Sequence, residues 1–182
     1  MPINALSGTK NKGVIKSISS TTFRDGMASL PGAVNIVTTD GVQGQAGFTA
    51  TAVCSVSDNP PTLLVCLNRR ASVHNVFSIS TSLVINTLTP EQQHLSNLFG
   101  GKANMTERFS SAQWETLVTG SPVLKGAAVS FDCKITNLMS VATHDVIFCE
   151  VVAIKQQEQA GALLYFQRQY RELVNTQKDS AS

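Results

Sequence analysis

Several sequence features that would assign a function directly are missing from this chain. It has no C-x-x-C pair, so neither a zinc knuckle nor a thioredoxin-like redox site is predicted. It has no G-x-G-x-x-G and no Gly-Lys-Ser/Thr loop, which argues against a Rossmann unit and a P-loop nucleotidase. No apolar run approaches the roughly 20 residues of a membrane helix. The longest basic run is Arg69-Arg70, which disfavours nucleic acid as the main partner.

Charge is also scarce. Charged residues are 14% of the chain, with a net charge of +2, against roughly 25% charged residues in an average soluble domain. Hydrophobic residues are an ordinary 42%. Much of the surface must therefore be uncharged or covered by another chain, and we expect a homodimer. The segment Met1–Thr22 lacks the apolar run of a secretory signal, so we expect a cytoplasmic location. The four cysteines are expected to be buried and reduced.

The length of 182 residues is typical of one domain with a sizeable core. Residues 1–20 are rich in Ser, Lys, Asn and Gly and show no hydrophobic periodicity. Residues 175–182 are similar in character. We therefore predict a flexible extension over 1–20, a folded domain over 21–174 and a flexible tail over 175–182.

Short β-rich runs dominate the predicted secondary structure. A helix is expected near Phe23–Leu30, a second between Ser72 and Phe77 with Ser72 as its cap, and a third after the capping box that begins at Thr89-Pro90. No regular β-α-β alternation is present, so we predict an antiparallel β-barrel with a few peripheral helices. The strands are expected at residues 33–39, 62–67, 83–88, 129–135, 146–154 and 163–166.

The most informative stretch is Gly47–Asn68. It sets small and hydroxyl residues directly before an apolar strand, and Pro60-Pro61 stiffens the entry to that strand. Hydroxyls and free backbone N–H groups can hold a phosphate, and small residues let a flat ring approach the backbone. Composition alone leaves a structural alternative open, in which these hydroxyls form hydrogen bonds only with neighbouring backbone groups.

This stretch resembles the signature of the short-chain flavin reductases, the small partners of two-component flavin-dependent monooxygenases. The resemblance covers residues 22–174, and within the family it is greatest to the reductases that serve pyrimidine utilisation and 4-hydroxyphenylacetate oxidation. It implies an FMN-binding split β-barrel, Greek-key-like in topology, that works as a homodimer. Further motifs that carry it are Arg70-Ala71-Ser72, Leu83–Leu88, Leu98–Lys102, Thr143-His144-Asp145, Leu164-Tyr165-Phe166 and Tyr170.

The resemblance also implies a cofactor site. One group of residues would line the flavin ring and continue its wall, and a second would reach the ribityl chain or phosphate, with Lys102 supplying positive charge. The first group is Thr49, Thr51, Ala52, Ser55, Val56 and Ser57, and the second is Asn68, Ser72 and Asn75. The resemblance implies further cofactor-binding residues at Ala50, Leu67, Phe99 and Gly100.

His144 is the one catalytic candidate, expected near the nicotinamide and the flavin, where it would position them or supply a proton. The neighbouring Asp145 is poorly placed to orient it, because adjacent residues on a strand face opposite ways. His74 and His94 are expected to have surface or packing roles. The three histidines are too scattered to indicate a metal site, and none is predicted.

The implied activity is hydride transfer from NADH or NADPH to FMN or FAD, with the reduced flavin supplied to a separate monooxygenase. Because the hydride passes between cofactors, no nucleophile or acid/base pair is needed. Two alternatives stay open at this point. One is an electron carrier of the same fold that keeps its FMN bound, and the other is a flavin-free split barrel that acts as a binding module.

Overall fold

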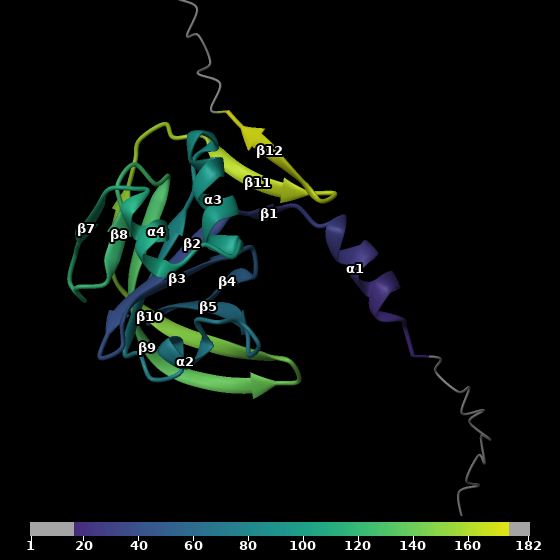
Figure 1. Cartoon of the computed structure of the whole chain (residues 1–182), viewed down its shortest axis with the longest axis horizontal. Coiled ribbons are helices and arrows are strands. Elements are labelled where there is room, and N and C mark those ends of the chain that lie inside the picture. The colour runs from purple at the N-terminus through teal and green to yellow at the C-terminus, as the bar shows by residue number, and fades with distance from the viewer. Residues whose placement is uncertain (1–16, 175–182) are drawn as a thin grey trace, which may run out of the picture.

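The computed structural model describes residues 17–174, and the chain folds mainly as antiparallel sheet (Figure 1). The predicted tail 175–182 lies outside the described residues, as does the predicted extension apart from residues 17–20. Ser19 caps the first helix there, accepting a hydrogen bond from the Thr22 backbone N–H at 3.1 Å. Within the described part, no helix is long and apolar enough to cross a membrane.

The central feature is a seven-stranded sheet in which every neighbouring pair is antiparallel. Its strand order is β3-β2-β6-β9-β10-β5-β4. The strands are β2 (Asn35–Gly41), β3 (Gly44–Ala50), β4 (Val53–Asp58), β5 (Pro61–Asn68), β6 (Ser82–Thr87), β9 (Val129–Val141) and β10 (His144–Gln156).

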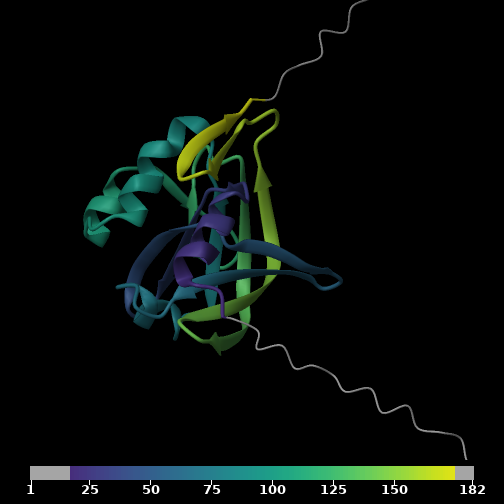
Figure 2. The ribbon, with the colours of Figure 1, turned by 90° about the vertical axis from the view of Figure 1, so that its right-hand side faces the viewer.

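The two edge strands of this sheet, β3 and β4, are consecutive in the chain and are joined only by Thr51-Ala52. The sheet therefore curls until its two edges come together, as the side view shows (Figure 2). The Cys66 backbone N–H donates to the Ala52 carbonyl at 3.1 Å, which ties the link to β5. The result is a barrel that is split beside the link, as predicted from sequence.

Smaller elements surround the barrel. A three-stranded sheet orders as β1-β11-β12, and β7 pairs with β8. The first helix, α1, stands away from the sheet (Figure 1), whereas α3 and α4 lie along β3. Their bounds are β1 (Gly32–Ala33), β7 (Trp114–Thr116), β8 (Pro122–Leu124), β11 (Ala162–Phe166), β12 (Gln169–Leu173), α1 (Ser20–Ala28), α2 (His74–Phe77), the 3₁₀ turn η1 (Pro90–Gln92), α3 (Gln93–Gly100) and α4 (Met105–Ser110).

Two hydrophobic clusters stabilise this arrangement. The first fills the barrel with residues from β2, β3, β5, β6, β9 and β10, and Phe77 of α2 closes it against Phe48 at a ring-centroid distance of 5.0 Å. The second lies outside the barrel, where Leu95 and Phe99 of α3 pack on β2 and β11. Successive side chains leave a strand on opposite faces, so one strand can contribute residues to both clusters. Strand β2 does so, with Val37 in the first cluster and Ile36 in the second.

A close backbone approach at Gly47 fixes how α3 lies against β3. A Cβ at Gly47 would stand 2.7 Å from Cε1 of the Phe99 ring, so only glycine allows this contact. Phe99 is fully buried and also contacts Phe109 and Trp114. The glycine that the sequence places before Phe48 therefore brings the C-terminal end of α3 onto the barrel.

Most of the predicted elements are present, but strands β3, β4, β7, β8 and β12 were not among those predicted. Three further differences concern a cap, the cysteines and a helix. Ser72 makes no side-chain cap for α2, which begins at His74 without one. The cysteines are not all buried, since Cys54 is exposed on the edge strand β4 and Cys66 is half-buried. Helix α4 was not predicted, because its Met-Thr-Glu-Arg-Phe-Ser sequence is too short to show a helical period.

Candidate functional site

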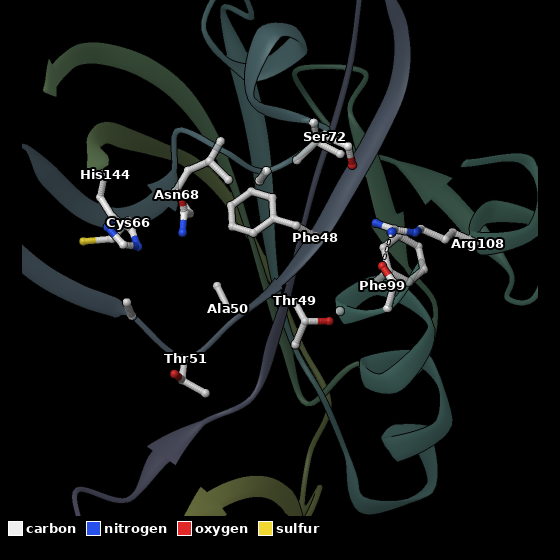
Figure 3. Close-up of a pocket in the computed structure, with 16 residues that line it drawn as sticks. Phe48, Thr49, Ala50, Thr51, Cys66, Asn68, Ser72, Phe99, Arg108 and His144 are labelled. Carbon is white, nitrogen blue, oxygen red and sulfur yellow. Dashed lines mark hydrogen bonds between the residues drawn. The ribbon is translucent and has the colours of Figure 1, made fainter. Parts of the chain in front are cut away.

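One pocket of about 410 Å³ opens at the split of the barrel, within the usual size range of small-molecule sites. Figure 3 shows the residues that line it as sticks. Four segments build most of its wall: β3 with the following link, the end of β5, the turn before α2, and the end of α3. Helix α4 and strand β10 add one residue each. The lining residues are Phe48, Thr49, Ala50, Thr51, Ala52, Cys66, Leu67, Asn68, Ala71, Ser72, Val73, Phe99, Gly100, Gly101, Arg108 and His144.

Small residues form one side of the pocket. Ala50 and Ala52 carry only methyl groups, and Thr51 lies between them on the link that leaves β3. The Thr49 hydroxyl donates to the Ser96 carbonyl at 2.8 Å, which holds this part of β3 to α3. The side chains on this side are therefore short enough for a flat ring to approach the backbone. The threonine hydroxyl oxygens can still accept hydrogen bonds.

The register between β5 and β10 places His144 in the pocket. His144 stands directly opposite Asn68 in this antiparallel pair, so both side chains lie on the same face of the sheet. The Thr143 hydroxyl oxygen is 2.9 Å from His144 Nδ1. Nε2 has no hydrogen-bond partner within residues 17–174, which leaves one ring nitrogen free to meet a ligand.

Asp145 points the opposite way from His144 and is buried, with a side chain only 3% exposed. It accepts hydrogen bonds from His74 Nε2 at 2.6 Å and from the Ser140 hydroxyl at 2.7 Å, and Arg69 Nε is 3.9 Å away. The bond from His74 is the main reason that the pKa of the Asp145 carboxyl lies below its ordinary value. The sequence argument that Asp145 does not orient His144 is confirmed.

The His74–Asp145 contact closes the turn between β5 and α2. The backbone N–H groups of Ala71 and His74 donate to Asn68 and Ala71 carbonyls at 2.9 and 3.0 Å. Ser72, at the middle of this turn, lines the pocket, and neither its hydroxyl nor its N–H has a partner within the described residues. The turn is held at both ends and presents free polar groups at its centre.

Arg108 is a pocket residue that the sequence did not reveal. It lies on α4, is only 4% exposed, and its guanidinium donates to the carbonyls of Gly47, Gly101 and Ala103 at 2.8–3.0 Å. Burial lowers its pKa from the ordinary value, but a guanidinium stays charged at neutral pH. No motif marked it, because a single arginine in a short polar segment is ordinarily solvated.

The structure brings most of the predicted cofactor residues together. Nine predicted residues line the pocket with His144; these are Thr49, Ala50, Thr51, Ala52, Leu67, Asn68, Ser72, Phe99 and Gly100. Five others do not line it: Ser55, Val56, Ser57, Asn75 and Lys102. The first three lie on β4, whose side chains after Val53 are exposed in this single chain, so they do not continue the wall.

Comparison with known proteins agrees with this architecture. A family model described as "Flavin reductase like domain" matches residues 27–174. The chain belongs to this flavin reductase-like family. It is 60% identical over 154 residues to FMN reductase (NADH) RutF of Stutzerimonas stutzeri, a match that spans 85% of this chain and 88% of the relative.

Solved structures of similar fold include a candidate flavin reductase from Haemophilus somnus, with 49% identity and a TM-score of 0.84 over 86% of this chain and all of that one. Another is BorF, the flavin reductase component of a bacterial two-component tryptophan halogenase, with 26% identity and a TM-score of 0.79 over 87% of this chain and all of BorF. The resemblance predicted from the sequence, to the flavin reductases with a split-barrel fold, is confirmed.

The residues of the pocket fit a flavin. The methyl groups of Ala50 and Ala52 leave space for a flat ring, and the Phe48 and Phe99 rings give the pocket an apolar floor. Asn68, Ser72 and Thr51 add polar groups suited to hydroxyls and ring heteroatoms. Burial raises the pKa of the Cys66 thiol, so it stays neutral beside such a ligand.

Asp145 gives a first testable prediction. Because its pKa is lowered in the folded chain, its stabilising contribution is complete above the unfolded value of about 3.9 and is lost as the pH falls through the lower folded value. We expect the free energy of unfolding to fall with pH in that acid range, and Asp145→Asn to flatten this dependence while lowering stability at pH 7. Urea denaturation from pH 7 to 2 measures both effects.

The control for this measurement is Asp40→Asn, at an exposed carboxylate on β2. It should keep the wild-type pH profile. An Asp145→Asn variant with an unchanged profile would show that the contact with His74 contributes nothing to folding.

Proposed function

We propose that this protein transfers a hydride from NADH to FMN and releases the reduced flavin to a separate flavin-dependent oxygenase. The observation that carries the proposal is the pocket at the split of the barrel, which Ala50, Thr51 and Ala52 line together with His144, whose Nε2 has no hydrogen-bond partner within residues 17–174. The S. stutzeri relative is named an FMN reductase that uses NADH, which favours FMN over FAD and NADH over NADPH.

A bound flavin supplies the ring that accepts the hydride, so the protein's task is to bind and align two flat ligands. We propose that Thr49, Thr51 and the backbone of Ala50 and Ala52 line that ring. Asn68 holds polar groups near its centre. The pocket is partly open to solvent, which would give a nicotinamide access to the exposed face of the ring.

His144 is proposed as the residue that meets both ligands. Its place opposite Asn68 puts it on the pocket face of the sheet, and Thr143 holds its Nδ1 side at 2.9 Å. Nε2 is then the atom that can donate a hydrogen bond or a proton where negative charge develops. Its role in alignment or proton supply follows from this free nitrogen.

A separate oxygenase is supported by BorF, which is a reductase component of a two-component halogenase and shares this fold over its whole length. A reductase of that kind must release its product, and an open pocket suits an exchangeable flavin better than a permanently bound one. The oxygenase and pathway of this chain, pyrimidine or aromatic oxidation, stay predictions, as does the cytoplasmic location.

We also propose that the protein works as a homodimer. Helix α1 buries none of its residues in the single chain. Phe23, Met27 and Leu30 remain 62%, 47% and 60% exposed on and just after this helix. An apolar stripe on a helix that stands away from its own barrel is suited to cover by a second copy, and the low charge of the chain agrees with this.

The function is tested by NADH oxidation at 340 nm under air, with and without added FMN. We expect oxidation that requires FMN and continues for many turnovers per protein. Tight stoichiometric FMN binding without turnover would indicate an electron carrier instead. Neither oxidation nor flavin binding would indicate a barrel that acts as a binding module.

His144→Ala tests the proposed role of this residue. The variant should lower kcat by roughly 10²-fold, the lower range for loss of a positioned acid or base, with little change in the KM for FMN. His94→Ala is a matched control, since His94 is exposed on α3 and does not line the pocket. Equal kcat in wild type and His144→Ala would limit His144 to a structural role.

The dimer is tested by light scattering. Wild-type protein at micromolar concentration should have twice the mass of one chain, and the double variant Phe23→Glu/Leu30→Glu should shift it towards the monomer, because two charges would be buried in the contact. Val42→Glu, at the exposed turn after β2, should leave the mass unchanged. A monomeric wild type would refute the proposal.

A further inference from the structure

The turn between β9 and β10 consists of Ala142 and Thr143 and leads directly into His144. Its backbone is fixed from two sides. His144 pairs with a residue of β9 on one side and with Asn68 of β5 on the other. The Arg69 backbone N–H also donates to the Thr143 carbonyl at 3.0 Å. The position of the His144 backbone is therefore set by contacts with both neighbouring strands.

The conformation of this turn is unusual. Ala142 has a φ of 49°, in the left-handed region that favours glycine, and a residue with a Cβ is strained there. Strained residues persist where the surrounding structure holds them, and they gather at functional sites. The turn also changes the direction of the Thr143 side chain. Adjacent strand residues face opposite ways, but Thr143 lies in the turn, and its hydroxyl reaches the ring of the next residue.

One hydrogen bond orients the His144 ring. The Thr143 hydroxyl oxygen is 2.9 Å from Nδ1, and within residues 17–174 neither ring nitrogen has another hydrogen-bond partner. Thr143 is exposed, and its hydroxyl has no second partner in that part of the chain. The orientation of the ring, and the choice of which nitrogen carries the proton, therefore depend on this contact.

Two arrangements of hydrogens fit this contact in a neutral ring. In the first, the hydroxyl donates to Nδ1, and the ring proton lies on Nε2. In the second, Nδ1–H donates to the hydroxyl oxygen, and Nε2 keeps a lone pair. A ring that accepts a hydride gains negative charge, which an N–H donor stabilises and a lone pair repels. The first arrangement is therefore the one suited to the proposed reaction.

We propose that Thr143 is a positioning residue whose hydroxyl donates to His144 Nδ1 and keeps the proton of the neutral ring on Nε2. The inference rests on the proposed function and adds to it the protonation state in which His144 meets the ligands. Thr143 acts only through His144, because it does not line the pocket itself. The motif Thr143-His144-Asp145 then has two separate uses, since Thr143 holds His144 whereas Asp145 holds His74.

The kinetic test begins with Thr143→Val, which keeps the shape of the side chain without the hydroxyl. It should lower kcat by roughly 5- to 10-fold, as expected for loss of one neutral hydrogen bond, and leave the KM for FMN and for NADH near wild type. Thr143→Ser keeps the hydroxyl and should keep kcat close to wild type. Thr116→Val, at an exposed threonine of β7 that does not line the pocket, is the matched control and should leave kcat unchanged.

A double-mutant cycle separates positioning from a structural role. If Thr143 acts through His144, Thr143→Val should have no effect on kcat in the His144→Ala background. A further loss of kcat there, of the same size as in wild type, would mean that Thr143 only supports the fold and would overturn the proposal. A Thr143→Ser variant as slow as Thr143→Val would overturn it as well, because the hydroxyl would then have no role.

The tautomer is measured without any activity. In ¹⁵N-labelled protein at alkaline pH, where histidine rings are neutral, the nitrogen shifts should show a proton on Nε2 of His144 and none on Nδ1, with His144→Ala assigning the signals. Thr143→Val should give a mixture of both tautomers. A proton on Nδ1 in wild type would overturn the proposal, whatever the kinetics of the variants.

This measurement also separates the two proposals. If wild type oxidises no NADH in the presence of FMN, the proposed function fails, and the wild-type spectrum still decides whether Thr143 sets the tautomer of His144. If Thr143→Val does not fold, which its backbone amide signals would show, the wild-type spectrum and the kcat of Thr143→Ser still decide the inference.

Discussion

The register of β5 against β10 is the constraint on which the site depends. It pairs His144 with Asn68, whose side chains both lie on the pocket face of the sheet, and Asp145 with Leu67, whose side chains leave the strands on the opposite face. A slip of one residue would exchange these faces, burying His144 and exposing the carboxylate. The inward Asp145 then holds His74, which closes the Ser72 turn, so the same register shapes two walls of the cavity.

The two buried charges near the pocket are balanced in different ways. The Asp145 carboxylate accepts hydrogen bonds from His74 and Ser140 inside the protein, and it serves to hold His74 in place. Arg108 is held by carbonyls alone, which fix a planar cation without cancelling its charge.

The predicted site residues that are adjacent in the chain line the pocket together, whereas those farther along the same stretches do not line it. Thr49–Ala52 and Phe99-Gly100 line the cavity because each is a short stretch at the end of an element. Ser55–Ser57 continue the same stretch in sequence, but β4 leaves the cavity with its side chains exposed. Lys102 and Asn75 were expected in the site from the family resemblance, and neither lines the pocket of this single chain.

The sequence by itself determined the family, the mainly antiparallel β architecture, the capping box that begins at Thr89, and the opposite orientation of His144 and Asp145. These follow from local conformational preferences and from the two-residue period of a strand. Only the tertiary structure decided that Arg108 reaches the pocket, that His74 is the partner of Asp145, and that β3 and β4 meet as edges of one curled sheet. Those contacts join residues far apart in the chain, and their positions depend on how the whole sheet closes rather than on any local pattern.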